Sequence, residues 1–88
     1  MSFDFDDDKN VTFSANVDNR SGILSTLLNA IAQAGANILS INQTIPINGI
    51  ANVTITVETQ DINTDMAEFV DKMSRIDGIR SLKIIARE

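Results

Sequence analysis

VDNRSGILSTLLNAIAQAGANI, residues 17–38, is the stretch of sequence that decides the fold. After its polar turn, residues 19–22, apolar side chains recur at the spacing of an amphipathic helix, at Leu24, Leu27, Leu28 and Ile31. Asn19 and Ser21 are candidate caps for the start of this helix, and Gly35 is typical of the residue that ends one. Such a turn either only reverses the chain or also holds a small anionic ligand, because the N–H groups at a helix start attract negative charge.

Three neighbouring segments have the patterns of β-strands. Residues 11–18 and 50–59 alternate apolar and polar side chains, which predicts two strands that are buried on one face. The side chains predicted to face the core are Val11, Phe13, Ala15, Val17, Ala51, Val53, Ile55 and Val57. Residues 36–45 predict a strand with apolar side chains on both faces, because Ile38 points one way and three others point the opposite way. Those three are Leu39, Ile41 and Ile45.

A hairpin and a second helix are predicted further along the chain. Pro46 and the turn dipeptide at residues 48–49 predict the hairpin. The second helix is predicted from apolar side chains at helical spacing, which are Ile62, Met66, Phe69, Val70, Met73 and Ile76. Asp65 and Glu68 have the spacing of a capping box at its start.

The predicted elements follow the order β-α-β-β-α-β. Asp77-Gly78 ends the second helix, and residues 79–87 predict the last strand. Its inward-facing side chains are predicted to be Leu82, Ile84 and Ala86. Two right-handed crossovers place both helices on one face of a four-stranded antiparallel sheet with strand order 4-1-3-2. The fold class is therefore predicted as α+β, a ferredoxin-like sandwich over residues 11–88 that follows a flexible acidic tail, residues 1–10.

The second predicted strand lies at an edge of this sheet. An edge strand with apolar side chains on both faces and no Lys is open to pairing with another strand. We therefore expect two copies of the chain to join there into one continuous sheet, as a homodimer or part of a higher homo-oligomer. The residues expected at this dimer interface are Leu39, Ser40, Ile41 and Asn42.

The composition narrows the classes of partner. The chain has 88 residues, enough for one small domain, and its net charge is −5. An acidic chain repels phosphate and anionic lipid, so we expect neither nucleic acid nor a membrane as a partner. The sequence has no Cys and no His, so it lacks thiolate ligands and the commonest zinc ligand. We expect no metal site and no cofactor. It also has no signal-peptide pattern and no membrane-spanning run, so we expect a cytoplasmic protein.

Several motifs of the chain match one known family. They are Val17-Asp18, Asn19-Arg20-Ser21-Gly22, Ile23-Leu24, Ala30-Ile31-Ala32 and Gly35-Ala36-Asn37-Ile38. On these residues, and over about residues 11–87, the sequence resembles the ACT domain, a regulatory amino-acid-binding module. The run INQTIPINGIANV, residues 41–53, is more specific. It looks closest to the PheB-type subgroup, which is named for phenylalanine biosynthesis and sometimes labelled chorismate mutase.

The resemblance implies a ligand site between subunits, where the turn after the first strand meets the second strand of a partner. The candidate ligand-binding residues are Asp18, Asn19, Arg20, Ser21, Gly22, Ile23, Leu24, Asn37 and Ile38. The chain departs from the family at Ser21, where many ACT turns have Pro. PheB-type members also have a helical N-terminal segment that this chain lacks, so it resembles an excised domain or a short paralogue.

The chemistry of these residues fits a free amino acid. Gly22 lets the N–H groups at the helix start approach a carboxylate. Asn19 or Asn37 would orient the ammonium group, and Asp18 would pair with it. The apolar residues available to line a side-chain pocket are Ile23, Leu24 and Ile38. A simpler interpretation also stands, in which Asn19 and Ser21 only cap the helix and Arg20 is a solvated charge.

Three functions remain open at this level. The first is a non-catalytic regulatory module that binds an amino acid such as phenylalanine, or another hydrophobic one, at a homodimer interface. The second is a chorismate mutase, which needs several convergent cations around a dianion, whereas only Arg20 lies in the candidate turn. The third is a dimerisation module without a ligand.

Overall fold

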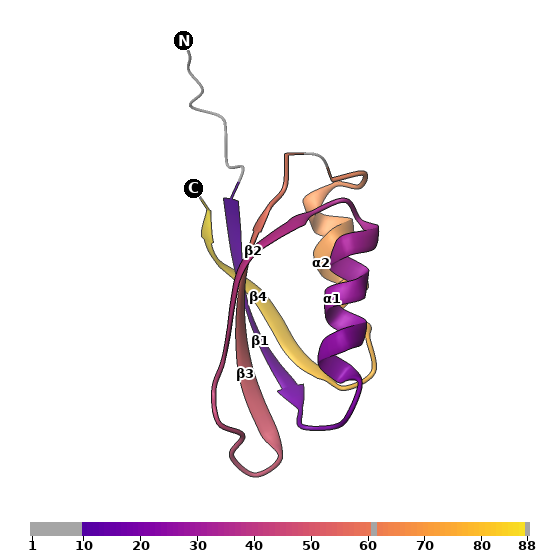
Figure 1. Ribbon diagram of the computed structural model, residues 1–88. Coiled ribbons are helices and arrows are strands. Elements are labelled where there is room, and N and C mark those ends of the chain that lie inside the picture. The colour runs from indigo at the N-terminus through magenta and orange to yellow at the C-terminus, as the bar shows by residue number, and fades with distance from the viewer. Residues whose placement is uncertain (1–9, 61, 88) are drawn as a thin grey trace.

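The protein is a two-layer sandwich of one sheet and two helices (Figure 1). The computed structural model describes residues 10–60 and 62–87. Its elements are β1 (Asn10–Asp18), α1 (Ile23–Gln33), β2 (Asn37–Gln43), β3 (Ile50–Glu58), α2 (Met66–Ser74) and β4 (Ile79–Arg87). The predicted tail, residues 1–10, lies outside the described residues except for Asn10, which begins β1.

The sheet has the predicted topology. Its order is β2-β3-β1-β4, which is the predicted order 4-1-3-2 read from the opposite edge, and every neighbouring pair is antiparallel. Both helices cover the same face of the sheet (Figure 1). The predicted ferredoxin-like fold is therefore confirmed.

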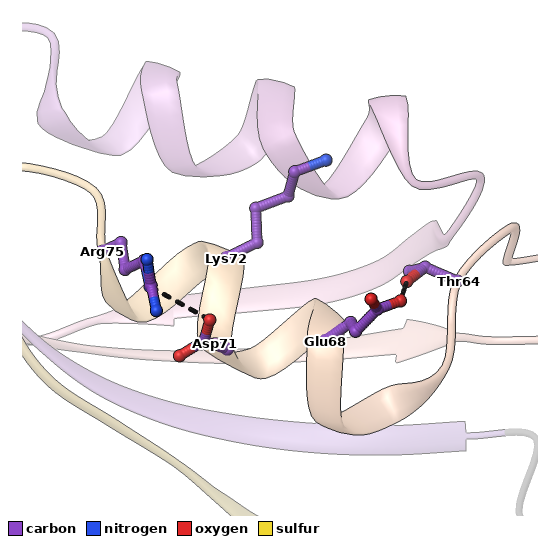
Figure 2. A pocket seen from close by; sticks show the side chains of 5 residues that line it. All are labelled: Thr64, Glu68, Asp71, Lys72 and Arg75. Carbon is purple, nitrogen blue, oxygen red and sulfur yellow. Dashed lines mark hydrogen bonds and ion pairs between the residues drawn. The ribbon is translucent and has the colours of Figure 1, made fainter.

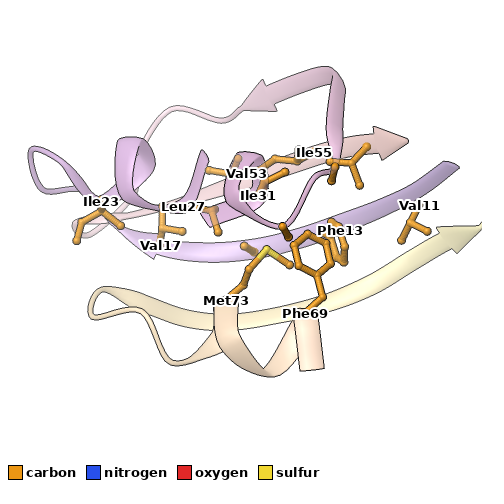
Figure 3. Packing of buried hydrophobic residues seen from close by; sticks show 14 of the residues in the cluster. Val11, Phe13, Val17, Ile23, Leu27, Ile31, Val53, Ile55, Phe69 and Met73 are labelled. Carbon is orange, nitrogen blue, oxygen red and sulfur yellow. The ribbon is translucent and has the colours of Figure 1, made fainter. Parts of the chain in front are cut away.

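The core lies between the helices and the two central strands, β1 and β3. The eight side chains predicted to face the core, Val11, Phe13, Ala15, Val17, Ala51, Val53, Ile55 and Val57, are almost completely buried against the helices. The ring of Phe13 packs edge-to-face against the ring of Phe69 from α2, with centroids 5.6 Å apart and an angle of 73° between the planes (Figure 3). Leu27 and Ile31 bring α1 onto the same core. The apolar stripes of both helices therefore meet one continuous cluster.

The other face of the sheet is lined by short polar side chains that bond to one another. Asn52 Nδ2 donates to Ser14 Oγ and to Asn16 Oδ1, both at 3.1 Å. Asn16 Nδ2 in turn donates to Ser81 Oγ at 3.0 Å. This face is consistent with the predicted alternation, because the polar side chains of β1 and β3 point to it.

A β-bulge in β4 corrects one predicted orientation. Ala86 lies opposite Thr12 and Ile84 lies opposite Phe13, so β4 has one residue more than β1 between these pairs. Opposed residues share a face of the sheet, which puts Ala86 on the polar face with Thr12. Ala86 is exposed there, and the prediction that it faces inward is wrong.

Another bulge lies in β2. Ile38 is opposite Val57 and Ser40 is opposite Thr56, which leaves Leu39 as the extra residue. Ile41 is consequently opposite Ile55, on the helix face that Ile38 also occupies. The prediction that Ile38 and Ile41 point to opposite faces is therefore wrong, because the bulge shifts the alternation by one residue.

The helix ends are held by side chains of the neighbouring loops. The Asn63 side chain and backbone N–H donate to the carbonyls of Gln33 and Ala34 at the end of α1, at 3.1 and 2.8 Å. At the start of α2, the Asp65 carboxylate accepts from the Glu68 N–H at 2.8 Å, which is one half of the predicted capping box. The Glu68 carboxylate accepts from the Thr64 hydroxyl at 2.8 Å. In the described part of the chain, neither helix has the length and apolar character needed to cross a bilayer.

We expect Phe69→Ala to lower the free energy of unfolding by about 3–5 kcal/mol, because it leaves a cavity against Phe13. Ile85→Ala is the matched control, since the Ile85 side chain is 52% exposed on β4. The control is expected to change the unfolding free energy by less than about 0.5 kcal/mol. Urea denaturation measures both changes, and similar losses in the two variants would contradict this position of the core.

Candidate ligand-binding turn

Three turns meet at one end of the sheet (Figure 1). They are the candidate turn at residues 19–22, the turn between α2 and β4, and the hairpin between β2 and β3. The Asp18 N–H donates to the Gly78 carbonyl at 2.8 Å, and the Asn19 N–H donates to the Gly49 carbonyl at 2.7 Å. The backbone of the candidate turn is therefore held by two distant parts of the chain.

The start of α1 has a glycine cap. Gly22 is the N-cap residue, with a left-handed φ of 89°, and no side chain caps the helix. The prediction that Asn19 or Ser21 caps α1 is therefore wrong, because the cap position falls on a residue without a side chain. The Thr26 N–H and hydroxyl both donate to the Gly22 carbonyl, at 3.0 and 2.8 Å. The N–H groups of the first turn are left without a side-chain acceptor, which suits an anion.

Four charged side chains surround the end of β1. The Asp18 carboxylate accepts from Arg80 Nε at 2.6 Å and lies 3.5 Å from Arg20 Nη2. The same Arg20 nitrogen lies 3.4 Å from the Asp77 carboxylate. Asp18 already has two cationic partners, so it is not the free partner for a ligand ammonium that the sequence suggested. Arg20 is 52% exposed with two long contacts, and such surface ion pairs are weak.

Arg80 contacts Asp18, and Asp77 and Gly49 contact the candidate turn, but none of the three is among the residues predicted from the sequence. The position of Arg80 could have been predicted from the sheet topology. In an antiparallel pair the end of one strand lies beside the start of the other, so the end of β1 meets the start of β4. Asp77 and Gly49 follow from tertiary contacts that no local pattern marks.

The two apolar residues at the start of α1 have different environments. Ile23 is only 8% exposed and belongs to the core cluster. Leu24 is half-buried and packs against that cluster. Within one chain, Leu24 is therefore the more accessible of the two to a ligand at the turn.

Asn37 and Ile38 lie at the opposite end of the sheet from the candidate turn. Asn37 pairs with Glu58, whereas Asp18 pairs with Ile50 at the other end of β3. At about 3.3 Å per residue, these two positions on β3 are about 26 Å apart. One chain therefore does not bring its predicted ligand-binding residues together.

The predicted interface residues lie on a free edge. β2 has β3 on one side and no strand of the described residues on the other. The side chains of Leu39, Ser40, Ile41 and Asn42 are all exposed. This edge presents unpaired backbone N–H and C=O groups beside two apolar side chains.

A shallow hollow of about 340 Å³ lies along the exposed face of α2 (Figure 2). It is lined by Thr64, Glu68, Asp71, Lys72 and Arg75. Arg75 Nε pairs with the Asp71 carboxylate at 3.0 Å, and the Thr64 hydroxyl donates to Glu68 at 2.8 Å. Four of the five lining residues are thus paired with one another on an exposed helix surface, so the hollow is a weaker ligand site than the turn. Over residues 10–60 and 62–87, no three acidic side chains gather as a metal site requires.

Comparison with known sequences identifies the family. The family model described as the ACT domain matches residues 7–83. A UPF0735 ACT domain-containing protein from Acetivibrio thermocellus is 46% identical over 80 residues, which cover 91% of this chain and 54% of that protein. Another, from Shouchella clausii, is 45% identical over 75 residues, covering 85% and 51% respectively. The chain spans about half the length of the curated relatives it matches.

Solved structures share the fold at low sequence identity. The ACT domain of a GTP pyrophosphokinase from Chlorobium tepidum superposes with a TM-score of 0.70 and 17% identity, over 86% of this chain and 96% of that one. An ACT domain protein from Streptococcus pneumoniae gives 0.68 and 19%, over 86% of each chain. The chain belongs to the ACT domain family, whose members are typically regulatory modules that bind small molecules. The PheB-type subgroup stays a prediction.

We expect Gly78→Ala to destabilise the fold more than Gly49→Ala does. Both residues have positive φ, 99° and 77°, so each substitution costs about 1–2 kcal/mol in backbone strain. At Gly78 the added Cβ would also lie 2.3 Å from Ile23 Cδ1, whereas nothing lies within 4 Å at Gly49. Thermal unfolding measures the difference, and equal effects would show that Ile23 moves away at no cost.

Proposed function

We propose that the chain is a regulatory module that binds a free amino acid between two copies joined through their β2 edges. One observation carries this proposal: the predicted ligand-binding residues lie at opposite ends of a single chain. A two-fold pairing of β2 edges would reunite them. In that pairing the strands run antiparallel, so the start of the partner's β2 lies beside the end of β2 near the candidate turn. Each interface then combines a turn from one copy with Asn37 and Ile38 from the other.

The contrast between the two edges of the sheet supports pairing through β2. β2 carries no charged side chain and exposes Leu39 and Ile41. The opposite edge strand, β4, carries Arg80, Lys83 and Arg87. Charged side chains protect an edge from pairing, because a second strand would bury them. A second copy therefore has reason to pair with β2 rather than with β4.

The groups at the reunited site match the two charges of an amino acid. The uncapped first turn of α1 and the loosely held Arg20 suit its carboxylate. The Asn19 and Asn37 side chains are exposed and are the polar candidates for its ammonium group. Leu24 and Ile38 are half-buried apolar residues beside these groups, which favours a ligand with an apolar side chain. Phenylalanine, the ligand that the PheB-type resemblance suggests, has such a side chain.

The chorismate mutase reading has less support. The structure brings Arg80 next to Arg20, but Asp18 and Asp77 pair with these cations. A clamp for a dianion needs cations whose charge is free for the substrate. The names of the relatives state no enzymatic activity. Because the relatives are about twice as long, the domain that responds to the ligand is also a proposal, and we place it in the rest of such a longer protein.

A thermal-shift screen of the twenty amino acids, followed by calorimetric titration, tests this function. An amino acid at about 100 times its dissociation constant adds about 2.7 kcal/mol of stability. We expect one hydrophobic amino acid to raise the melting temperature, and Asn19→Ala and Asn37→Ala each to weaken its binding about tenfold or more. Both side chains are exposed, so neither substitution removes a core contact.

Lys72→Ala is the matched control, because Lys72 lines the hollow on α2. Unchanged binding in this variant is expected. Binding that survives both Asn variants but fails in Lys72→Ala would move the ligand to α2 and overturn the proposed site. A dimer by light scattering that responds to no amino acid would overturn the sensor function and leave a dimerisation module.

A further inference from the structure

The hairpin between β2 and β3 exposes large apolar side chains. Ile45 is 85% exposed and Ile47 is 73% exposed, whereas the Ile side chains of the core are almost completely buried. Leu39 and Ile41 of β2 are also exposed, so four of the exposed large apolar residues of the described chain lie on β2 and the hairpin that follows it. In Figure 1 the hairpin projects beyond the candidate turn at the end of the sheet. A concentration of exposed large apolar side chains on one segment marks an interaction surface.

This tip is held in shape by backbone hydrogen bonds. Ile47 and Ile50 exchange two N–H···O=C bonds, at 2.9 and 3.0 Å, around a tight turn with left-handed Asn48 and Gly49. The Thr44 N–H donates to the Asn52 carbonyl at 2.9 Å. The apolar side chains are therefore presented by an ordered turn, which reduces the entropy lost when a partner covers them.

The part of the chain that surrounds the hairpin has no charged side chains. Residues 21–57, which form α1, β2, the hairpin and nearly all of β3, contain no Asp, Glu, Lys or Arg. A copy of this chain carries the same net charge of −5, so two copies approach with least repulsion through this half. A basic partner would instead be drawn to the acidic side chains elsewhere. The charge distribution therefore favours a second copy as the occupant.

We propose that the β2–β3 hairpin is an arm that docks on a second copy of this chain and thereby holds the candidate ligand turn in place. This inference rests on the proposed pairing of β2 edges. Because paired β2 strands run antiparallel, each hairpin extends past the partner's β2 toward the segment that joins the partner's α1 to that strand. In this chain that segment includes Gly35 and Asn37, which are exposed, uncharged and small enough to receive an Ile side chain.

The arm also reaches the candidate turn of its own chain. The Asn19 N–H donates at 2.7 Å to the carbonyl of Gly49, which lies in the tight turn of the hairpin. Docking of Ile45 and Ile47 would restrict the hairpin and with it this hydrogen bond. Assembly would then order the turn that contacts the ligand. The arm would thereby couple the two parts of the proposed function, dimer formation and ligand binding.

The test compares the double variant Ile45→Ser/Ile47→Ser with the control Ile85→Ser. Ile85 is an exposed apolar residue on β4, the opposite edge. Sedimentation equilibrium is expected to show dimers about tenfold or more weaker in the double variant and unchanged in the control, since burial of two Ile side chains is lost. Hydrogen exchange of the Asn19 amide, measured by NMR, is expected to accelerate at a concentration where wild type is dimeric and the variant is monomeric.

Each outcome separates this inference from the proposed function. A wild-type chain that stays monomeric at high concentration overturns the proposed pairing as well as the arm. A wild-type dimer with the same dissociation constant in the double variant overturns the arm alone. Equal weakening by the Ile85 control, or Asn19 exchange that does not follow dimerisation, overturns it too. Circular dichroism checks that both variants are folded, as expected because all three side chains are exposed.

Discussion

The unbroken register between β1 and β3 is the constraint on which the rest of the structure depends. The strands pair without a bulge from Asn10 opposite Glu58 to Asp18 opposite Ile50. Because side chains alternate, this one register turns the apolar side chains from Val11 to Val17 and from Ala51 to Val57 to the helices, and the polar side chains between them to the other face. A slip of one residue would expose the whole core. The bulges accordingly lie in the outer strands, two in β4 and one in β2, where changed orientations cost less.

The central strands and the order of elements were therefore predictable from the sequence. Their alternation is long and regular, and the six elements allow few packings once crossovers are right-handed. The bulges at Leu39 and Ile85 were not predictable, because a period of two does not mark where an extra residue enters. Ile41 and Ala86 were consequently assigned to the wrong faces, although both strands were correctly located.

The candidate site also has local features that the sequence predicts and long-range contacts that it does not. The turn at residues 19–22 is a local feature, so its glycine and its place at a helix start follow from the sequence. The partners of Asp18 are not local, since Arg80 comes from β4 and only the register brings them together. The helix cap was misassigned because Asn19 and Ser21 have good capping side chains, while the left-handed backbone of Gly22 moves the cap position onto a residue that has none.

The candidate turn, residues 19–22, lies at one end of the sheet and is too open in a single chain to enclose a ligand. Small-molecule sites bury about 70–90% of a ligand's surface, whereas a Cβ at Gly22 would meet no other atom within 4 Å. A ligand held there therefore needs a second surface, and the charge-free half of the same chain lies next to the turn. If a second copy supplies that surface, the ligand binds tightly only to the assembled form. Ligand binding then stabilises the assembly, and assembly stabilises ligand binding by the same free energy. The openness of the isolated turn would then be the property that makes this domain a sensor rather than a permanent carrier.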